Sequence, residues 1–391
     1  MSHLKFALVL GGCMGAASFG IDSLAPVLPL LAGEFGISAG QSQLALTLGM
    51  LGFSLGQIPA GMASDRYGRR LVLYSALSVF SLTSLAAMAF SDFSSLLALR
   101  AIQGLSLAGL AVSARAIVRD VASGVDAGAL MSSVTTVMAT ATVAAPLVGG
   151  FFGAHYGWRS AFLVMAAYGI VCLLPVRSVV PAAGRRPRQP SPWRQLGVSV
   201  RSFVSNRQSV RGVLVNAAAF SGLFGFMTAA AGVANDVYAL PQWMLGPAIA
   251  LIPLMLVAAS QISRRIVRSL GLRRQERLAV GLLALASVGQ LLGLSLGTPP
   301  LALVWGLAMF YALGFGLLMP VVTALVLDPQ PRSAGFAAAI LGTSQSAAGA
   351  TASVLMAATY DQSVVPLCVL MGAAGLLAGG ALLALGGRQS G

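Results

Sequence analysis

Two ionisable residues stand alone inside long apolar stretches of the first half of the chain. Asp22 lies in the run 4–31 and Arg100 in the run 94–115. An ionisable side chain inside an apolar span is expensive to bury, so it usually serves a function such as proton transfer or ion recognition. Apolar surroundings and a neighbouring cation would together decide when Asp22 takes up a proton. We therefore expect Asp22 and Arg100 to form a proton-coupling pair; the alternative is a structural ion pair that joins the two spans.

The residues that surround this pair must form membrane helices. Apolar residues make up 57% of the 391 residues, and the mean hydropathy is +0.86. A helix needs about 20 apolar residues to cross a hydrocarbon core about 30 Å thick. The sequence contains about twelve runs that approach or exceed this length, which predicts an all-α integral membrane protein. The runs are 4–31, 41–63, 71–90, 94–115, 126–152, 159–176, 211–234, 243–262, 278–297, 300–327, 333–358 and 364–386.

The charged residues indicate how these spans are oriented. The formal net charge is +14, and most of the 24 Lys and Arg residues fall between alternate runs or at the two ends. Basic loops stay in the cytoplasm, so we predict that both termini are cytoplasmic. No basic soluble domain is left that would bind nucleic acid. The sequence also lacks a phosphate-binding loop, a metal-binding His/Cys spacing and a nucleophile motif, so we expect no metal, no cofactor and no enzymatic activity.

One segment divides the chain into two parts. It is rich in Pro and Arg, and it separates six runs from six runs. We predict an N-terminal six-helix bundle (1–176), a cytoplasmic basic linker (177–210) and a C-terminal six-helix bundle (211–391). Within the linker, Trp193 to Val204 forms either a helix that lies on the membrane surface and contacts lipid phosphates, or an unstructured connection.

A faint internal repeat supports the two bundles. The segment "SDRYGRR" follows the second run, and the degraded echo "VRSLGLRR" follows the eighth, which pairs Gly68 with Gly271. Two six-helix bundles related by an axis along the membrane normal are the arrangement of the major facilitator transporters. The repeat therefore predicts this fold, with a central cavity between the bundles.

The charged stretch "GMASDRYGRR" resembles the motif that this superfamily carries between its second and third spans. The matching residues are Gly61, Asp65, Arg66, Gly68, Arg69 and Arg70. Gly61 would permit close helix packing and Gly68 a tight turn, while Asp65 would face the positive end of a neighbouring helix. The resemblance places that helix at the start of the eleventh span, near Ser333, and the arginines can pair with Asp120. We expect a conformational latch that breaks during the transport cycle; the alternative is that the arginines only fix the topology.

Further motifs resemble the bicyclomycin and chloramphenicol resistance branch (Bcr/CflA type) of the drug:proton antiporters. The segments are "GIDSLAPVLP" around Asp22, "RAIQGLSLAG" from Arg100, "ATVAAPLVGG" in the fifth span and "GWRSAF" after it. Leu24, Ala141 and Ala145 depart from the pattern of that branch. In the fifth span, small residues would allow close helix contact and a proline would bend the helix. This predicted helix-packing motif consists of Pro146, Gly149 and Gly150.

The second half carries almost no charge inside its spans. It offers aromatic, methionine and amide side chains, which suit an adaptable apolar cavity with a few hydrogen-bonding groups. The residues predicted to line the substrate cavity, two of them from the first half, are Gln103, Met138, Asn216, Phe220, Phe224, Met227, Tyr311 and Gln345.

The resemblance implies a function. It predicts a monomeric transporter of the bacterial inner membrane that exports small amphipathic molecules, including antibiotics, in exchange for protons by alternating access. A carrier specific for one metabolite or siderophore is the first alternative, because three positions depart from the motifs. A membrane receptor that does not transport is the second.

Overall fold

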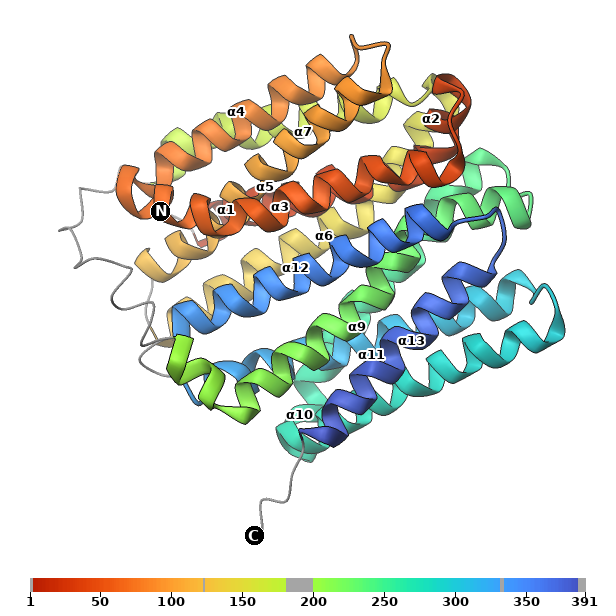
Figure 1. Cartoon of the computed structure of the whole chain (residues 1–391). Helices are drawn as coiled ribbons and strands as arrows, with labels where there is room; N and C mark the ends of the chain where they lie inside the picture. Colours follow the sequence, from red (N-terminus) through yellow and green to blue (C-terminus); the bar gives the residue numbers. More distant parts are fainter. Residues whose placement is uncertain (1–2, 122–123, 181–199, 331–333, 386–391) are drawn as a thin grey trace. The chain divides into compact units, whose positions relative to one another are not determined.

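In the part that the structure describes, the chain consists of helices joined by short turns. The computed structural model describes residues 3–121, 124–180, 200–330 and 334–385, and in these ranges no strand is present (Figure 1). This confirms the predicted all-α fold class. The helices are α1 (His3–Asp22), η1 (Ala25–Val27), α2 (Leu28–Phe35), α3 (Ala39–Tyr67), α4 (Arg69–Ala87), α5 (Phe93–Val121), α6 (Gly124–Tyr156), α7 (Arg159–Val179), α9 (Arg207–Gly232), η2 (Val233–Val237), α10 (Gln242–Gly293), η3 (Leu294–Leu296), α11 (Leu301–Leu327), α12 (Ala334–Thr359) and α13 (Val365–Ala384).

The helices cluster into two compact units. Unit 1 contains α1 to α7 together with the stretch 230–250, and unit 2 contains the rest of α9 and α10 with α11 to α13. Within unit 1, α3 packs most extensively against α5, and α1 packs against α6. The units differ from the predicted halves, 1–176 and 211–391, in the placement of 230–250. The division into two halves therefore remains a prediction.

Eleven of the described helical segments are long and apolar enough to cross a membrane, by length and composition. They match eleven of the twelve predicted runs. The remaining run corresponds to α12, which has 26 residues but is not among the eleven. Its Ser, Thr, Gln and Gly residues lower its hydropathy, and small and polar residues of this kind suit a helix that packs against other helices.

The first span is not one continuous helix. Helix α1 ends at Asp22, a short 3-10 turn (η1) follows, and α2 completes the span after Leu28. Pro26 and Pro29 lie in the first turns of η1 and α2, where a missing backbone N–H does no harm. Irregular backbone within a span occurs where protein or a water-filled cavity surrounds it. The break therefore places Asp22 at the free end of a helix inside a membrane span.

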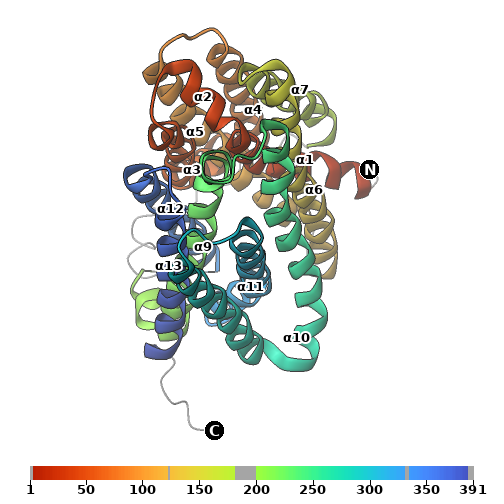
Figure 2. The same cartoon turned by 90° about the vertical axis from the view of Figure 1, so that its right-hand side faces the viewer.

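Gly68 and Gly271 adopt similar backbone conformations, as the internal repeat suggests. Gly68 separates α3 from α4 with φ 99° and ψ 141°, and Gly271 breaks α10 into two parts with φ 72° and ψ 165°. A side chain is disfavoured in this region of φ and ψ. Figure 2 shows that α10 turns back on itself, so it contributes two of the spans.

The predicted linker is described only in part, because residues 181–199 lie outside the described ranges. Residues 200–205 are helical. The ring of Phe203 packs edge-on against Phe336 at 6.1 Å, and Ser202 exchanges hydrogen bonds with Gln330. The end of the predicted surface helix thus packs on unit 2.

Candidate proton and substrate sites

The fully buried side chain of Arg100 on α5 joins three helices. Its Nε donates to the carbonyl oxygen of Ala45 on α3 at 3.0 Å. Its Nη1 donates to the carbonyl oxygen of Gly20 on α1 at 3.0 Å and to Oε1 of Gln103 at 2.7 Å. The last carbonyl oxygens of a helix lack intrahelical partners and carry partial negative charge. Arg100 therefore caps the end of α1 at the break in the first span.

Asp22 is the last residue of α1, and its side chain is half-buried. In the described part of the chain its carboxylate forms no hydrogen bond and no ion pair, so the expected ion pair with Arg100 is not formed here. Arg100 binds the carbonyl oxygen of Gly20 instead, two residues before Asp22. Arg100 therefore contacts the helix end on which Asp22 lies, but not the carboxylate of Asp22 itself.

Gln103 orients Arg100. It is fully buried, its Oε1 accepts from Arg100, and its Nε2 donates to Oγ of Ser84 on α4 at 2.9 Å. On the other side of the guanidinium, Nη2 has no hydrogen-bond partner among the described residues and lies against Gly49, where an added Cβ would stand 2.8 Å away. Gln103, predicted to line the cavity, therefore holds the arginine in this structure.

Arg69, the first residue of α4, connects the ends of three helices. Its Nη1 forms an ion pair with Oδ1 of Asp65 at the end of α3. Its Nε donates to Oδ2 of Asp120 near the end of α5 at 3.3 Å. The predicted pairing of a motif arginine with Asp120 is thus present. We call these three residues the Arg69 cluster.

Other motif residues behave differently. The guanidinium of Arg66 lies 5.3 Å from the ring of Tyr67, and that of Arg70 lies 5.9 Å from the ring of Tyr74. The expectation that Gly61 is needed for close helix packing is wrong for this structure, because an added Cβ would meet only a Val112 methyl at 3.6 Å, an ordinary contact. The predicted partner of Asp65 near Ser333 lies outside the described residues.

The fifth-span motif packs closely on other parts of unit 1. An added Cβ on Gly149 would collide with the carbonyl oxygen of Ser23, just after the break in the first span. An added Cβ on Gly150 would stand 2.6 Å from Cα of Gly246 in the first part of α10. Pro146 lies inside α6, and its carbonyl oxygen faces Gly246. The small residues therefore allow the backbones to approach, as the sequence suggested.

Unit 2 brings together most of the other predicted cavity residues. Asn216 is buried, and its Nδ2 donates to Oε1 of Gln345 at 3.2 Å, while its Oδ1 has no hydrogen-bond partner among the described residues. One turn further along α9, Phe220 stacks on Phe224 at 5.8 Å and contacts Phe315 at 5.7 Å. This part of unit 2 thus combines an amide pair with an aromatic cluster.

Two further predicted cavity residues of unit 2 are buried. Tyr311 donates from its hydroxyl to the carbonyl oxygen of Ala219 at 2.9 Å, and Met227 is 8% exposed. Met138 on α6, in unit 1, is half-buried. A groove of about 650 Å³ on unit 2 is lined by aliphatic residues of α9 and α13 and includes none of the predicted cavity residues. It therefore does not support the predicted substrate site.

Sequence reasoning missed two ion pairs. Arg211 pairs with Glu276 in unit 2, and Arg159 pairs with Glu34 at 2.8 Å in unit 1. Arg211 and Glu276 lie in sequence segments rich in arginine, and such segments were expected to be cytoplasmic loops. The lone acid within "RRQER" was the available signal.

Three features are typical of a membrane transport protein: eleven described helical segments long and apolar enough to cross a bilayer, a broken helix with an acid at the break, and a repeated helix–glycine–helix element. The family model described as "Major Facilitator Superfamily" matches residues 9–353. The chain belongs to this superfamily of transporters.

Two of the relatives have names that refer to drug resistance. The chain is 28% identical over 381 residues to the "Bicyclomycin resistance protein homolog" of Haemophilus influenzae, covering 95% of this chain and 94% of that protein. It is 26% identical to the "Multidrug resistance protein MdtL" of Klebsiella pneumoniae, covering 87% of this chain and 84% of that protein. These matches confirm the predicted resemblance to the drug:proton antiporter branch.

Solved structures confirm the fold. The xylose transporter XylE of E. coli in a partially occluded inward open conformation matches with a TM-score of 0.76 at 14% identity, covering 100% of this chain and 99% of that one. A bacterial homologue of the human lysosomal transporter Spinster matches with a TM-score of 0.69 at 15% identity, covering 98% and 95%. At these identities the likeness concerns the fold alone.

Proposed function

We propose that this protein exports small amphipathic molecules, antibiotics among them, in exchange for protons. The observation that carries the proposal is the break in the first span directly after Asp22, with Arg100 bound to the broken end of α1. An acid inside a span that lacks an ion-pair partner can gain or lose a proton without first breaking a salt bridge. Asp22 is therefore the proposed proton carrier, and Arg100 holds the helix end on which it lies.

The direction and the substrate class rest on the named relatives. One is called a bicyclomycin resistance protein homolog and another a multidrug resistance protein, and both match across most of the chain. Resistance through a transporter requires that the compound leaves the cell. The distribution of Lys and Arg supports a location in the bacterial inner membrane with both termini in the cytoplasm. We propose that the protein acts as a monomer, because one chain supplies both predicted six-helix bundles.

Alternating access requires contacts that form in one conformation and break in the other. The Arg69 cluster is our candidate, because it joins the ends of three helices through Arg69 alone, and one of its two acids, Asp65, is 71% exposed to water. In unit 2, Asn216, Gln345 and the aromatic cluster around Phe220 are the proposed contacts for an amphipathic substrate, through hydrogen bonds and ring stacking.

The test is transport by purified protein in liposomes with an imposed pH gradient. The panel consists of labelled bicyclomycin, chloramphenicol and a chemically unrelated amphipathic dye. Movement of several of these compounds against their gradients, driven by protons and abolished by a protonophore, would support the proposal. Transport of a single compound would favour the carrier specific for one metabolite. Movement that does not respond to the pH gradient would contradict proton coupling.

A further inference from the structure

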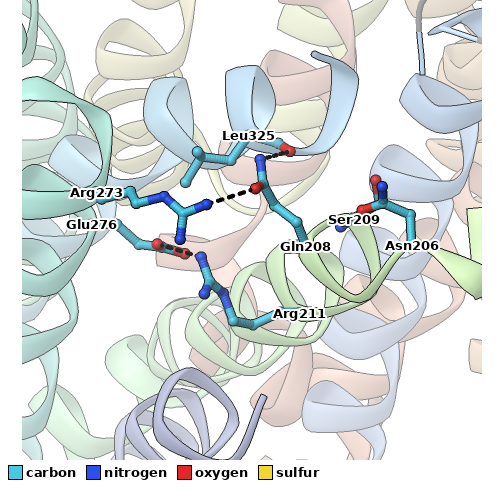
Figure 3. A network of polar contacts seen from close by, with 7 residues as sticks. All are labelled: Asn206, Gln208, Ser209, Arg211, Arg273, Glu276 and Leu325. Carbon is cyan, nitrogen blue, oxygen red and sulfur yellow. Dashed lines mark hydrogen bonds and ion pairs between the residues drawn. The ribbon is translucent and has the colours of Figure 1, made fainter. Parts of the chain in front are cut away.

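Arg211 and Glu276 form a buried ion pair in unit 2. Arg211 lies on α9 and Glu276 on the second part of α10, and Nη2 of the arginine stands 2.7 Å from Oε2 of the glutamate (Figure 3). Their side chains are 8% and 2% exposed. Removing one charge would leave the other buried without its main partner, which is unfavourable, although Arg273 and Arg277 also act on the carboxylate of Glu276. The pair therefore resists opening unless both groups become hydrated.

Polar contacts around the pair join a third helix. Nη2 of Arg273 donates to Oε1 of Gln208 at 3.0 Å, and Nε2 of Gln208 donates to the carbonyl oxygen of Leu325 on α11 at 3.0 Å (Figure 3). Oγ of Ser209 donates to the carbonyl oxygen of Val326 at 3.2 Å. Hydrogen bonds thus connect the start of α9, the part of α10 that follows Gly271 and the end of α11.

The buried pair has no reserve contacts of its own. Nε of Arg211 and Oε1 of Glu276 are buried and have no hydrogen-bond partner among the described residues. If the pair breaks, neither atom offers an existing bond that would replace it. The contact between these two side chains therefore depends on both charges, while Arg273 and Gln208 form a second contact between α9 and α10.

A different polar cluster lies beside the matching turn of unit 1. Arg69 follows Gly68, just as Arg273 and Glu276 follow Gly271, so both polar clusters lie beside the same kind of turn. The side chain of Asp65 is 71% exposed, whereas that of Glu276 is 2% exposed. Water therefore reaches Asp65 of the first cluster, although Arg69 itself is 12% exposed, whereas both partners of the second cluster are shielded from water.

We propose that Arg211 and Glu276 form a permanent clamp. The clamp holds three segments together throughout the transport cycle: the start of α9, the part of α10 that follows Gly271, and the end of α11. These segments therefore move as one body. The Arg69 cluster, whose Asp65 is exposed to water, opens and closes instead. Both halves of the repeat thus contain the glycine turn, but the charges beside it stay paired in unit 2 and separate during the cycle in unit 1. This inference concerns the protein's motion and does not depend on the transported compound.

The experiment measures the distance between the two clamped helices. Spin labels are attached at Arg207→Cys on α9 and Arg274→Cys on α10, both exposed positions, after Cys13, Cys172 and Cys368 have been replaced by Ala. Pulsed electron paramagnetic resonance then records the label distance in lipid nanodiscs at acidic and at alkaline pH. The clamp predicts one narrow distance distribution under both conditions. Two separate distances in the otherwise intact protein would overturn it.

Charge variants test whether the ion pair is responsible. Glu276→Gln keeps the shape but removes the charge, and the width of the distribution should at least double. The reciprocal variant Arg211→Glu/Glu276→Arg should restore the narrow distribution. Glu34→Gln, which removes the half-exposed ion pair with Arg159 in unit 1, is the matched control and should change nothing. An unchanged distance distribution in Glu276→Gln would contradict the clamp. If that variant does not fold, the distance distributions of the intact protein and of the reciprocal variant test the clamp.

Discussion

Arg100 donates a hydrogen bond to the carbonyl oxygen of Gly20 at 3.0 Å and thereby closes the end of α1 inside the first span. The same side chain binds the carbonyl oxygen of Ala45 on α3. A guanidinium carries several donors in a fixed plane, so it can bind acceptors from different helices at once. One buried side chain therefore ties the end of α1 beside Asp22 to α3 and α5.

Replacing this guanidinium should destabilise the protein even when the positive charge is kept. Arg100→Lys retains the charge but cannot reproduce the planar set of bonds, and we expect a loss of about 2 kcal/mol in the free energy of unfolding, near one or two charged hydrogen bonds. Arg100→Ala removes the whole buried side chain and leaves Oε1 of Gln103 without its donor, so it should lose about 3–5 kcal/mol. Thermal unfolding in detergent measures both. Equal stability of Arg100→Lys and the unaltered protein would show that only the charge matters.

The space beside Arg100 offers a milder test. Gly49→Ala would place a methyl group 2.8 Å from Nη2, so the guanidinium must shift away from its acceptors. We expect proton-driven transport to fall several-fold. Gly61→Ala on the same helix is the matched control, because its methyl group would stand 3.6 Å from the nearest side chain. Similar transport by both variants would argue against a function for the position of Arg100.

Asp22→Asn should separate transport from its driving force. Asparagine keeps the shape of the side chain but cannot titrate, so uphill pH-driven transport should be lost while downhill exchange of substrate continues. The direct measurement is proton release when bicyclomycin is added to detergent-solubilised protein. The unaltered protein should release protons and Asp22→Asn should not. Unchanged release would move the proton site elsewhere, with Asp236 the next candidate.

The Arg69 cluster and its turn should control the rate of the conformational cycle. Gly68 has φ 99°, so Gly68→Val forces a branched side chain into a disfavoured conformation that costs about 1–3 kcal/mol. Asp65→Asn removes the exposed charge without altering the turn. We expect both variants to bind substrate near normally at equilibrium but to transport it slowly. Normal transport by both would leave the arginines with a role in topology alone.

The contact of α6 with the broken first span should tolerate no side chain. Gly149→Ala would drive a methyl group into the carbonyl oxygen of Ser23, and backbone cannot move aside as easily as a side chain. We expect a loss of about 2 kcal/mol or more in stability, near the upper range for overpacking. Gly33→Ala, where an added Cβ meets nothing within 4 Å, should have little effect. Thermal unfolding of the two variants side by side tests the difference.

The sequence by itself determined the class of the protein. Hydropathy, the positions of basic residues and the loop motif are local properties of the chain, so they predicted the helical membrane fold and the superfamily. The repeat even located Gly271, because the unusual backbone conformation that it shares with Gly68 restricts the residue type. The pairing of a motif arginine with Asp120 could also be predicted, since both lie at the ends of adjoining spans.

Only the tertiary structure decided how the charges are used. Two of the three acceptors of Arg100 are the carbonyl oxygens of Gly20 and Ala45. Every residue carries a carbonyl oxygen, so the residue types in the sequence do not identify these acceptors. Arg211 and Glu276 lie 65 positions apart in basic segments, and burial appears only when α9 and α10 pack together. Hydropathy and charge are read along the chain, whereas exposure to water and the reach of a side chain depend on which helices become neighbours.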